Sequence, residues 1–202
     1  RGPGQTVNGI PLLGQITQIV TPKLNVADEA VNAITANFAY VTDIGSFGSL
    51  AFKVSYSDLF KHTYQDYPTD PSINELTNPN FSTDFKSKVN GSLTWIRNKW
   101  TATWYMNRYG STPNYLAQVY NNYTSPGTGK LAPWILSNAS LTFNPIKSLA
   151  LSFNVDNVFN KMPPVDKSYP GTTSEPYNIF NYNVYGRAYY LEANYKFGQG
   201  DN

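Results

Sequence analysis

The chain has 202 residues, a formal net charge of +2 and no cysteine. The lack of cysteine excludes disulfide bonds and thiolate chemistry, and so small a net charge gives no electrostatic case for nucleic-acid binding. Charged residues make up only 14% of the chain and aromatic residues 15%, whereas soluble domains average about 25% charged residues. This composition is typical of outer-membrane β-barrels, and glycan-binding β-domains are the competing class.

Alternating apolar and polar side chains predict an all-β chain of about eight strands. The first expected strand is weak, and the first residues of the second, 27–34, also fit a helical turn. No apolar run approaches the ~18 residues that a transmembrane helix requires. In chain order, the expected strands cover residues 12–20, 30–43, 49–61, 85–97, 100–110, 133–143, 149–160 and 186–198.

The connections between these strands alternate in length. Because antiparallel neighbours return the chain to the same end of a sheet at every second connection, all short turns should lie at one end and all long loops at the other. Outer-membrane barrels have this arrangement, with short periplasmic turns and long extracellular loops. The short turns are 44–48, 98–99 and 144–148, and the long loops are 62–84, 111–132 and 161–185.

The alternation also assigns side chains to the two faces of the sheet. In a membrane barrel the apolar face contacts lipid and the polar face lines the lumen. The polar face is expected to carry Lys53, Asp156 and Glu192. The residues predicted to face the membrane are Leu151, Phe153, Leu191, Tyr195 and Phe197.

The last fifty residues carry a recognisable pattern. It consists of Asp156, Asn157, Phe159, Asn160 and Lys161, then Tyr182, Tyr185, Gly186 and Arg187, and finally Tyr195 and Phe197. This pattern resembles the C-terminus of TonB-dependent outer-membrane receptors. The motif resemblance covers about 149–198, and over 28–148 it rests on the layout of strands and loops. Receptors of this family end at their terminal phenylalanine, whereas this chain continues through a tail, 199–202.

The resemblance implies an antiparallel transmembrane β-barrel of roughly 22 strands. Residues 1–198 would then be the C-terminal segment of the barrel domain, about its last eight strands. It also implies an N-terminal plug and the remaining strands, as a separate chain or as another part of the same one. TonB would contact the plug rather than this segment. Because the chain begins at Arg1 without an initiator methionine, a processed product or a fragment is expected.

The function implied by the resemblance is active transport across the bacterial outer membrane, driven by the TonB system. The partners would be outer-membrane lipid and a small extracellular ligand, which could be chelated iron, a carbohydrate or a peptide. We expect no cofactor, no nucleic-acid partner and no enzymatic activity. A soluble β-rich carbohydrate-binding module is the alternative, and a barrel enzyme is a third possibility that the lack of a histidine-centred catalytic group disfavours. Detergent dependence would distinguish the first two.

Candidate ligand-binding residues lie in the long loops. Tyrosine offers an apolar ring with a hydroxyl, and asparagine both donates and accepts hydrogen bonds. Such side chains suit sugars, peptides or aromatic chelates, but they could equally pack on one another and order the loops. The candidates are Tyr115, Tyr120, Asn122, Tyr123, Tyr177 and Tyr182.

No catalytic or metal site is predicted. The single histidine, His62, lies at the root of a long loop and is a weak candidate for either role. Oxygen ligands suit Ca²⁺, and four carboxylates share the loop 62–84. Their spacing matches no EF-hand, so a solvated loop is favoured. These carboxylates are Asp66, Asp70, Glu75 and Asp84.

Overall fold

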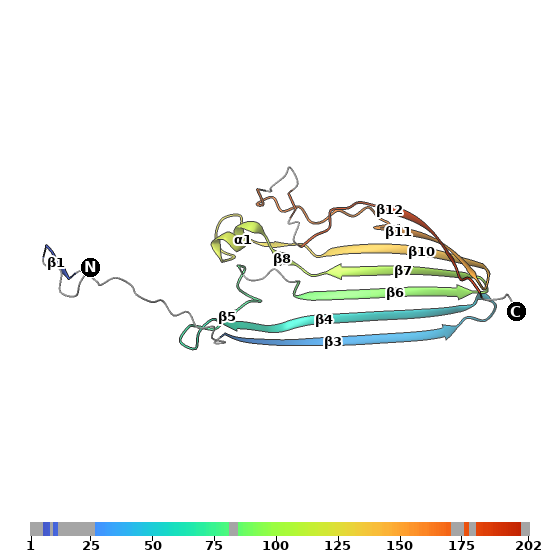
Figure 1. Cartoon of the computed structure of the whole chain (residues 1–202), viewed down its shortest axis with the longest axis horizontal. Coiled ribbons are helices and arrows are strands. Elements are labelled where there is room, and N and C mark those ends of the chain that lie inside the picture. The colour runs from blue at the N-terminus through green and yellow to red at the C-terminus, as the bar shows by residue number, and fades with distance from the viewer. Residues whose placement is uncertain are drawn as a thin grey trace.

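The computed structural model describes residues 6–8, 10–11, 27–80, 85–170, 176–177 and 181–198. These residues form an all-β fold built around one large antiparallel sheet (Figure 1). The strand predicted at 12–20 and the tail 199–202 lie outside the described residues. No helix in the described part of the chain has the length and hydrophobicity needed to cross a bilayer.

The sheet contains seven long strands and one short one. The long strands are β3 (Asp28–Asp43), β4 (Ser49–Gln65), β6 (Ser87–Arg97), β7 (Trp100–Tyr109), β10 (Trp134–Ile146), β11 (Leu149–Asp156) and β12 (Ala188–Tyr195). They lie in the order β12-β11-β10-β7-β6-β4-β3, and every neighbouring pair is antiparallel. The short strand β5 (Ile73–Asn74) pairs with β4. The sheet is open, and β3 and β12 are its two edges.

The predicted separation of turns from loops is confirmed. Figure 1 shows the hairpin turns and the C-terminus at one end of the sheet and the long connections at the other. We call these the turn end and the loop end. The loop end carries α1 (Tyr115–Tyr120) and the paired short strands β8 (Thr112–Pro113) and β9 (Lys130–Leu131). The remaining short elements are β1 (Thr6–Val7), β2 (Ile10–Pro11) and η1 (Gly45–Phe47).

Several predicted boundaries are wrong. Residues 28–34 belong to β3, so the alternative helical turn at 27–34 is excluded. β4 continues to Gln65, because its pairing with β3 persists beyond a register shift. β10 continues to Ile146, which shortens the predicted turn 144–148 to 147–148. β11 ends at Asp156, since Asn157 takes a left-handed backbone with φ of 50°.

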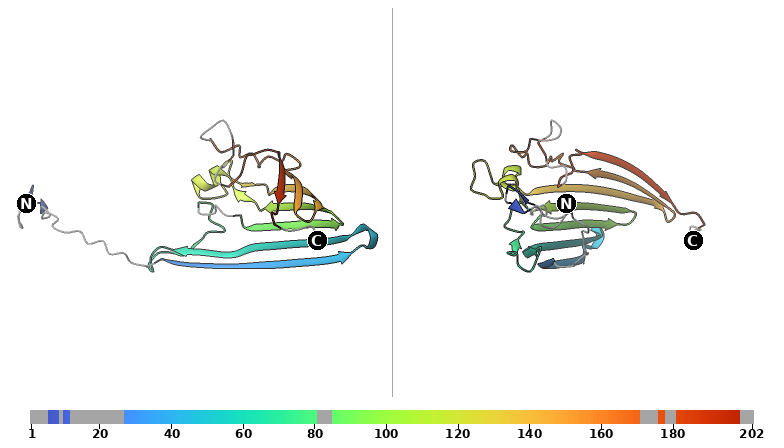
Figure 2. Two further views of the ribbon diagram at one scale, coloured as in Figure 1. Left: turned by 45° about the vertical axis from the view of Figure 1, so that its right-hand side comes forward. Right: turned by 60° about the vertical axis from the view of Figure 1, so that its left-hand side comes forward.

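The described part of the sheet contains one strand that the sequence did not predict. Among the described residues the eighth strand of the sheet is β5, which lies within the predicted loop 62–84. β12 is also shorter at both ends than the predicted strand 186–198. Figure 2 shows that the sheet is twisted and curved, with β12 running at a steep angle to β3 in its left view. Such twist is the usual consequence of strand chirality.

One face of the sheet is apolar across all seven long strands. Residues directly opposite each other on neighbouring strands share a face. One row of the apolar face is therefore Tyr40, Phe52, Leu93, Trp104, Ala139, Val155 and Tyr189. The next row is Thr42, Leu50, Trp95, Ala102, Leu141, Phe153 and Leu191.

The apolar face is solvent-exposed. Leu151, Phe153, Leu191 and Tyr195 lie on it, as the sequence predicts, and all four are exposed, with Leu191 at 86%. Phe197 lies just beyond β12 and is 88% exposed. On β7 the residues of this face between Trp100 and Arg108 carry no charge. Trp100 and Arg108 lie roughly 26 Å apart along the strand. Between these two levels the other long strands place no charged side chain on this face, and Arg187, just before β12, donates to the Tyr189 hydroxyl at 3.3 Å.

The opposite face is polar. One of its rows contains Asn37, Ser55, Asn90 and Asn107. Hydroxyl groups hydrogen-bond across strands at Thr94–Thr103, 3.1 Å, and at Thr142–Ser152, 2.9 Å. Lys53, Asp156 and Glu192 also belong to this face, as predicted. The sheet thus separates an apolar surface from a polar one with few exceptions.

The small buried core lies at the loop end. It is formed by Phe85, Trp134 and Tyr182, with Tyr109, Leu131 and Leu136 packed against them. Tyr109 and Trp134 pair with residues of the polar face. The loops therefore fold over the loop end of the polar face, whereas on the apolar face the ring of Phe159, from the loop that follows β11, lies 5.7 Å from the ring of Trp104.

Candidate functional site

Two long loops dock on each other at the loop end. Asp166 is 3% exposed, and its Oδ2 accepts a hydrogen bond from the backbone nitrogen of Tyr115 at 2.7 Å. Its Oδ1 accepts bonds from the backbone nitrogen and the hydroxyl of Ser168. The Ser168 Oγ in turn accepts a bond from the Leu116 nitrogen at 3.2 Å. The loop 157–187 thus supplies acceptors for nitrogens in the first turn of α1, which otherwise lack partners within the helix.

The first turn of α1 also has a local cap. Asn114 accepts a hydrogen bond from the Ala117 nitrogen at 2.9 Å, and the same oxygen accepts one from the Gly129 nitrogen. Its Nδ2 donates to the Gly127 carbonyl. Asparagine is a preferred residue at this position because its side chain satisfies a free amide of the helix. The six-residue helix is therefore held by a cap and by a neighbouring loop rather than by its own length.

The motif that follows β11 has a structural role at the rim of the sheet. Asn157 is buried, and its side chain bonds both the nitrogen and the carbonyl of Lys161. The Asn160 Oδ1 accepts a bond from the Arg187 nitrogen at 3.0 Å, just before β12 begins. Both asparagines have left-handed backbones, which asparagine tolerates better than most residues. The motif thus joins the end of β11 to the start of β12.

The six predicted ligand-binding residues differ in burial and in the contacts that they make. Tyr182 is 5% exposed and donates to or accepts from Thr112 across 3.1 Å. Burial raises its pKa, although the bond with Thr112 lowers it in part. Tyr177 is also buried. The Asn122 side chain bonds the nitrogens of Thr124 and Ser125 and so shapes its own turn.

The other three candidates lie on or beside α1. Tyr115 makes an edge contact with the ring of Tyr169, 5.6 Å between centroids. Tyr120 is exposed. Tyr123 is partly buried, which raises its pKa, and the Lys130 ammonium lies 5.0 Å from its ring centroid. Tyr120 is thus the one exposed side chain among the six candidates, and the ring of Tyr123 is contacted by Lys130.

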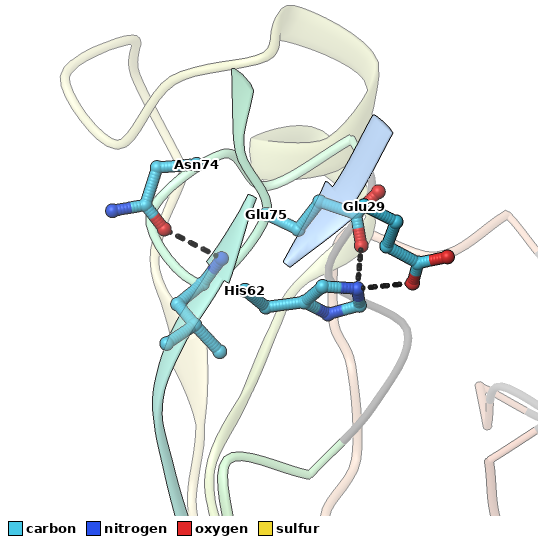
Figure 3. Close-up of polar contacts among 5 residues, drawn as sticks. Glu29, His62, Asn74 and Glu75 are labelled. Carbon is cyan, nitrogen blue, oxygen red and sulfur yellow. Dashed lines mark hydrogen bonds and ion pairs between the residues drawn. The ribbon is translucent and has the colours of Figure 1, made fainter. Parts of the chain in front are cut away.

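His62 connects the edge of the sheet to the first long loop (Figure 3). Its Nε2 lies 2.8 Å from Glu29 Oε1 and 2.9 Å from Glu75 Oε2. Glu29 comes from β3, and Glu75 follows β5, where its backbone nitrogen donates to the His62 carbonyl at 2.8 Å. The imidazole therefore ties β3, β4 and the loop together. Among the described residues, no group of three or more His, Asp and Glu side chains is arranged to hold a metal ion.

A pocket lies on the polar face where β10, β11 and β12 reach the loop end, and we call it the rim pocket. Its volume is about 370 Å³, within the range of small-molecule sites. Its lining consists of Trp134, Leu136, Asn138, Asp156, Asn157, Asn183, Tyr185, Gly186, Arg187, Ala188 and Tyr190. The aromatic wall and the amides give it both apolar surface and hydrogen-bonding groups.

The rim pocket was not predicted from the sequence. Its residues belong to three strands and to both ends of the loop 157–187, so only the fold brings them together. Asp156 was assigned to the polar face, and Tyr185 was noted as part of the C-terminal pattern. The signal that could have found Trp134 is its position at the start of a strand, on the polar face, beside a long loop.

A comparison with models of protein families and a comparison with curated proteins both gave no match for this chain.

Proposed function

We propose that this protein forms part of the wall of a TonB-dependent transporter in the bacterial outer membrane. The observation that carries the proposal is the exposed apolar face, which extends over seven strands without a charged side chain between the Trp100 and Arg108 levels. The band is roughly 26 Å long along β7, and the apolar band of outer-membrane barrels is about 25 Å tall. A strand tilt of about 35–45° reduces the height of this band across the membrane to roughly 18–21 Å.

The exposed area also favours lipid over water as the surroundings of this face. Soluble monomers rarely expose contiguous apolar patches above a few hundred Å². A soluble β-domain covers such a face with a second layer. The alternative function, a soluble carbohydrate-binding module, would therefore require another layer over residues such as Phe52, Trp104 and Phe153.

The edges of the sheet bear on how the wall is completed. In a bilayer every backbone amide needs a partner, so a sheet that spans it must close. β3 and β12 are edge strands here, and further strands would have to join them. We infer that the full barrel has roughly 22 strands, as in the receptors that the C-terminal pattern resembles. Transport needs no covalent step, so we expect no catalytic residue.

Single-cysteine labelling tests the assignment of the two faces. The chain has no native cysteine, so Leu191→Cys and Glu192→Cys can each carry one environment-sensitive fluorophore. Leu191 is on the apolar face and its neighbour Glu192 on the polar face. In membranes containing brominated phospholipids, the label at 191 should be strongly quenched and the label at 192 should not. Equal quenching, or recovery of the protein in a detergent-free soluble fraction, would favour the soluble module.

A second experiment tests energised uptake. The complete protein would be expressed in a host with and without TonB, and uptake of labelled candidate ligands would be measured. We expect accumulation only when TonB is present. Accumulation independent of TonB would refute the energy source, although the lipid-facing assignment would still stand on the labelling result.

A further inference from the structure

We propose that the turn end of the sheet binds one anionic phospholipid, with its phosphate at the hairpin turns and an acyl chain on the apolar face. The proposal names a lipid partner for the membrane protein proposed above, and it rests on that function for the side of the bilayer involved. The short turns of outer-membrane barrels lie on the periplasmic side, so the lipid would come from the periplasmic leaflet. Two neighbouring hollows at the turn end carry the argument.

The first hollow lies between the turn that joins β6 to β7 and the turn end of the β10–β11 hairpin, and we call it the turn hollow. Its volume is about 400 Å³. The Asn144 nitrogen donates to the Lys99 carbonyl at 2.8 Å, and the Lys99 ammonium donates to the Pro145 carbonyl. These contacts tie the two hairpins together and give the hollow its walls. It is lined by Asn98, Lys99, Asn144, Pro145, Ile146 and Lys147.

The turn hollow offers positive charge and hydrogen-bond donors. Lys99 and Lys147 line it, and both side chains are exposed. An ammonium group has three N–H donors, so the contact of Lys99 with Pro145 leaves two for a ligand. The side-chain amides of Asn98 and Asn144 make no hydrogen bond within the described residues, and they can donate as well. A phosphate group, which is negative and accepts several hydrogen bonds, complements this set of side chains.

The second hollow lies on the apolar face, and we call it the chain hollow. Its volume is about 450 Å³. Ser152 and Glu192 also border it, but they are paired with each other on the polar face, so their side chains point away from the hollow. The side chains of the apolar face that line it could bury an acyl chain. They are Trp100, Leu141, Leu151, Phe153, Leu191 and Ala193.

The two hollows are neighbours along the hairpin β10–β11. Ile146 lines the turn hollow and pairs with Leu149, whereas Leu151 lines the chain hollow. Leu149 and Leu151 are two residues apart, which is roughly 7 Å along a strand. Lys99 of the turn hollow also directly precedes Trp100 of the chain hollow in the sequence. One lipid molecule can therefore place its phosphate in the turn hollow and an acyl chain in the chain hollow.

Charge and exposure together favour an anionic phospholipid over the other occupants. Free phosphate would leave the chain hollow in water, whereas an acyl chain would cover side chains such as Leu191, which is 86% exposed. A zwitterionic headgroup would bring a cation beside Lys99 and Lys147. Arg97 adds positive charge at the turn end of β6, and the carboxylate of Asp43 belongs to β3, three strands from β7. Basic pockets at the border of a membrane-facing surface are suited to anionic headgroups.

Native mass spectrometry of the complete protein in tetraethylene glycol monooctyl ether, an uncharged detergent, measures the binding. The probes are palmitoyl-oleoyl phosphatidylglycerol, phosphatidylcholine with the same chains, and glycerol 3-phosphate, which has a phosphate but no chains. We expect phosphatidylglycerol to bind at least tenfold more tightly than either of the other two.

The double variant Lys99→Gln/Lys147→Gln should lose the preference for phosphatidylglycerol over phosphatidylcholine. Glutamine at position 99 can still donate to the Pro145 carbonyl, so the two hairpins should stay tied. The matched control is Lys53→Gln/Lys167→Gln, which removes the same charge from the polar face and from an exposed loop position. The control should keep the preference of the unaltered protein.

Three results would overturn the proposal. They are equal binding of the two phospholipids, a preference that the Lys99→Gln/Lys147→Gln variant retains, and binding of glycerol 3-phosphate as tight as that of the lipid, which would indicate a site for free phosphate. Failure here is distinct from failure of the transport function. The lipid-quenching experiment reports whether the apolar face meets a bilayer, whatever headgroup the turns prefer. Conversely, a protein that does not span a membrane could still bind one phospholipid in the two hollows.

Discussion

Asn160 and Gly186 lie so close that a β-carbon on Gly186 would be 2.8 Å from the Asn160 Oδ1. The same oxygen accepts the hydrogen bond of the Arg187 nitrogen. The absence of a side chain at position 186 thus allows the asparagine to reach the start of β12. This contact gives a physical reason for two elements of the C-terminal pattern, which lie on opposite sides of a long loop.

Gly186→Ala should destabilise the protein by about 1 kcal/mol. The new methyl group forces the Asn160 side chain away and breaks one hydrogen bond, whose net value is of that order. Denaturant unfolding in detergent measures the effect. Gly129→Ala is the matched control, because a β-carbon there would meet nothing within 4 Å. An equal loss in both variants would mean that the contact with Asn160 is not the cause.

Asp166→Ala should loosen the docking of the two loops by about 2–3 kcal/mol. The substitution leaves the Tyr115 nitrogen without its acceptor, and hydrogen bonds to charged groups contribute more than neutral ones. Hydrogen exchange of the amides of Tyr115 and Leu116 should accelerate at least tenfold, while the strands β6 and β7 stay protected. Asp70→Ala should change neither. Unaltered exchange at both α1 amides would contradict the role assigned to Asp166.

Phe153→Arg should impair insertion into membranes by about 2–4 kcal/mol, the cost of a cation on the lipid face near the bilayer centre. Asn154→Arg is the matched control, since its side chain is on the polar face of the same strand. Folding into vesicles, followed by the heat-dependent mobility shift on gels, measures the difference. Similar folding yields for the two variants would argue against lipid contact at Phe153.

The aromatic cluster at the loop end should weaken at alkaline pH. Burial raises the pKa of Tyr182 above its ordinary value of 10.0. Because the folded state holds the proton more tightly than the unfolded state, this contribution to stability is fully present below pH 10 and is lost as the pH rises through the folded pKa. Stability should therefore fall more steeply above pH 10 than in Tyr182→Phe. Parallel pH profiles in the two proteins would contradict the assignment.

The strands and their faces were predictable because a strand has a period of two, which any stretch of ten residues reveals locally. Phe153 and Leu191 could thus be assigned to a face without knowledge of their neighbours. The loop end could not be predicted in this way. The helix α1 depends on a hydrogen bond from Asp166, some fifty residues away in the chain. Neither the Asn114 cap nor the six-residue length would predict this helix from the sequence alone. Tyr182 resembles an open loop tyrosine in sequence, and only the tertiary packing against Trp134 buries it.

The sheet order has a consequence for how the chain acquires its structure. Every long strand is paired with the long strand that precedes or follows it in the chain. Within the described residues the ladder can therefore grow by adding one neighbouring strand at a time, although three of the six pairings between long strands close a long loop. The three tight turns provide the starting points, because short loops lose the least entropy on closure. A cut in either of the first two long loops would therefore leave complete hairpins on both sides, whereas a cut in the third would separate β12 from its only partner, β11.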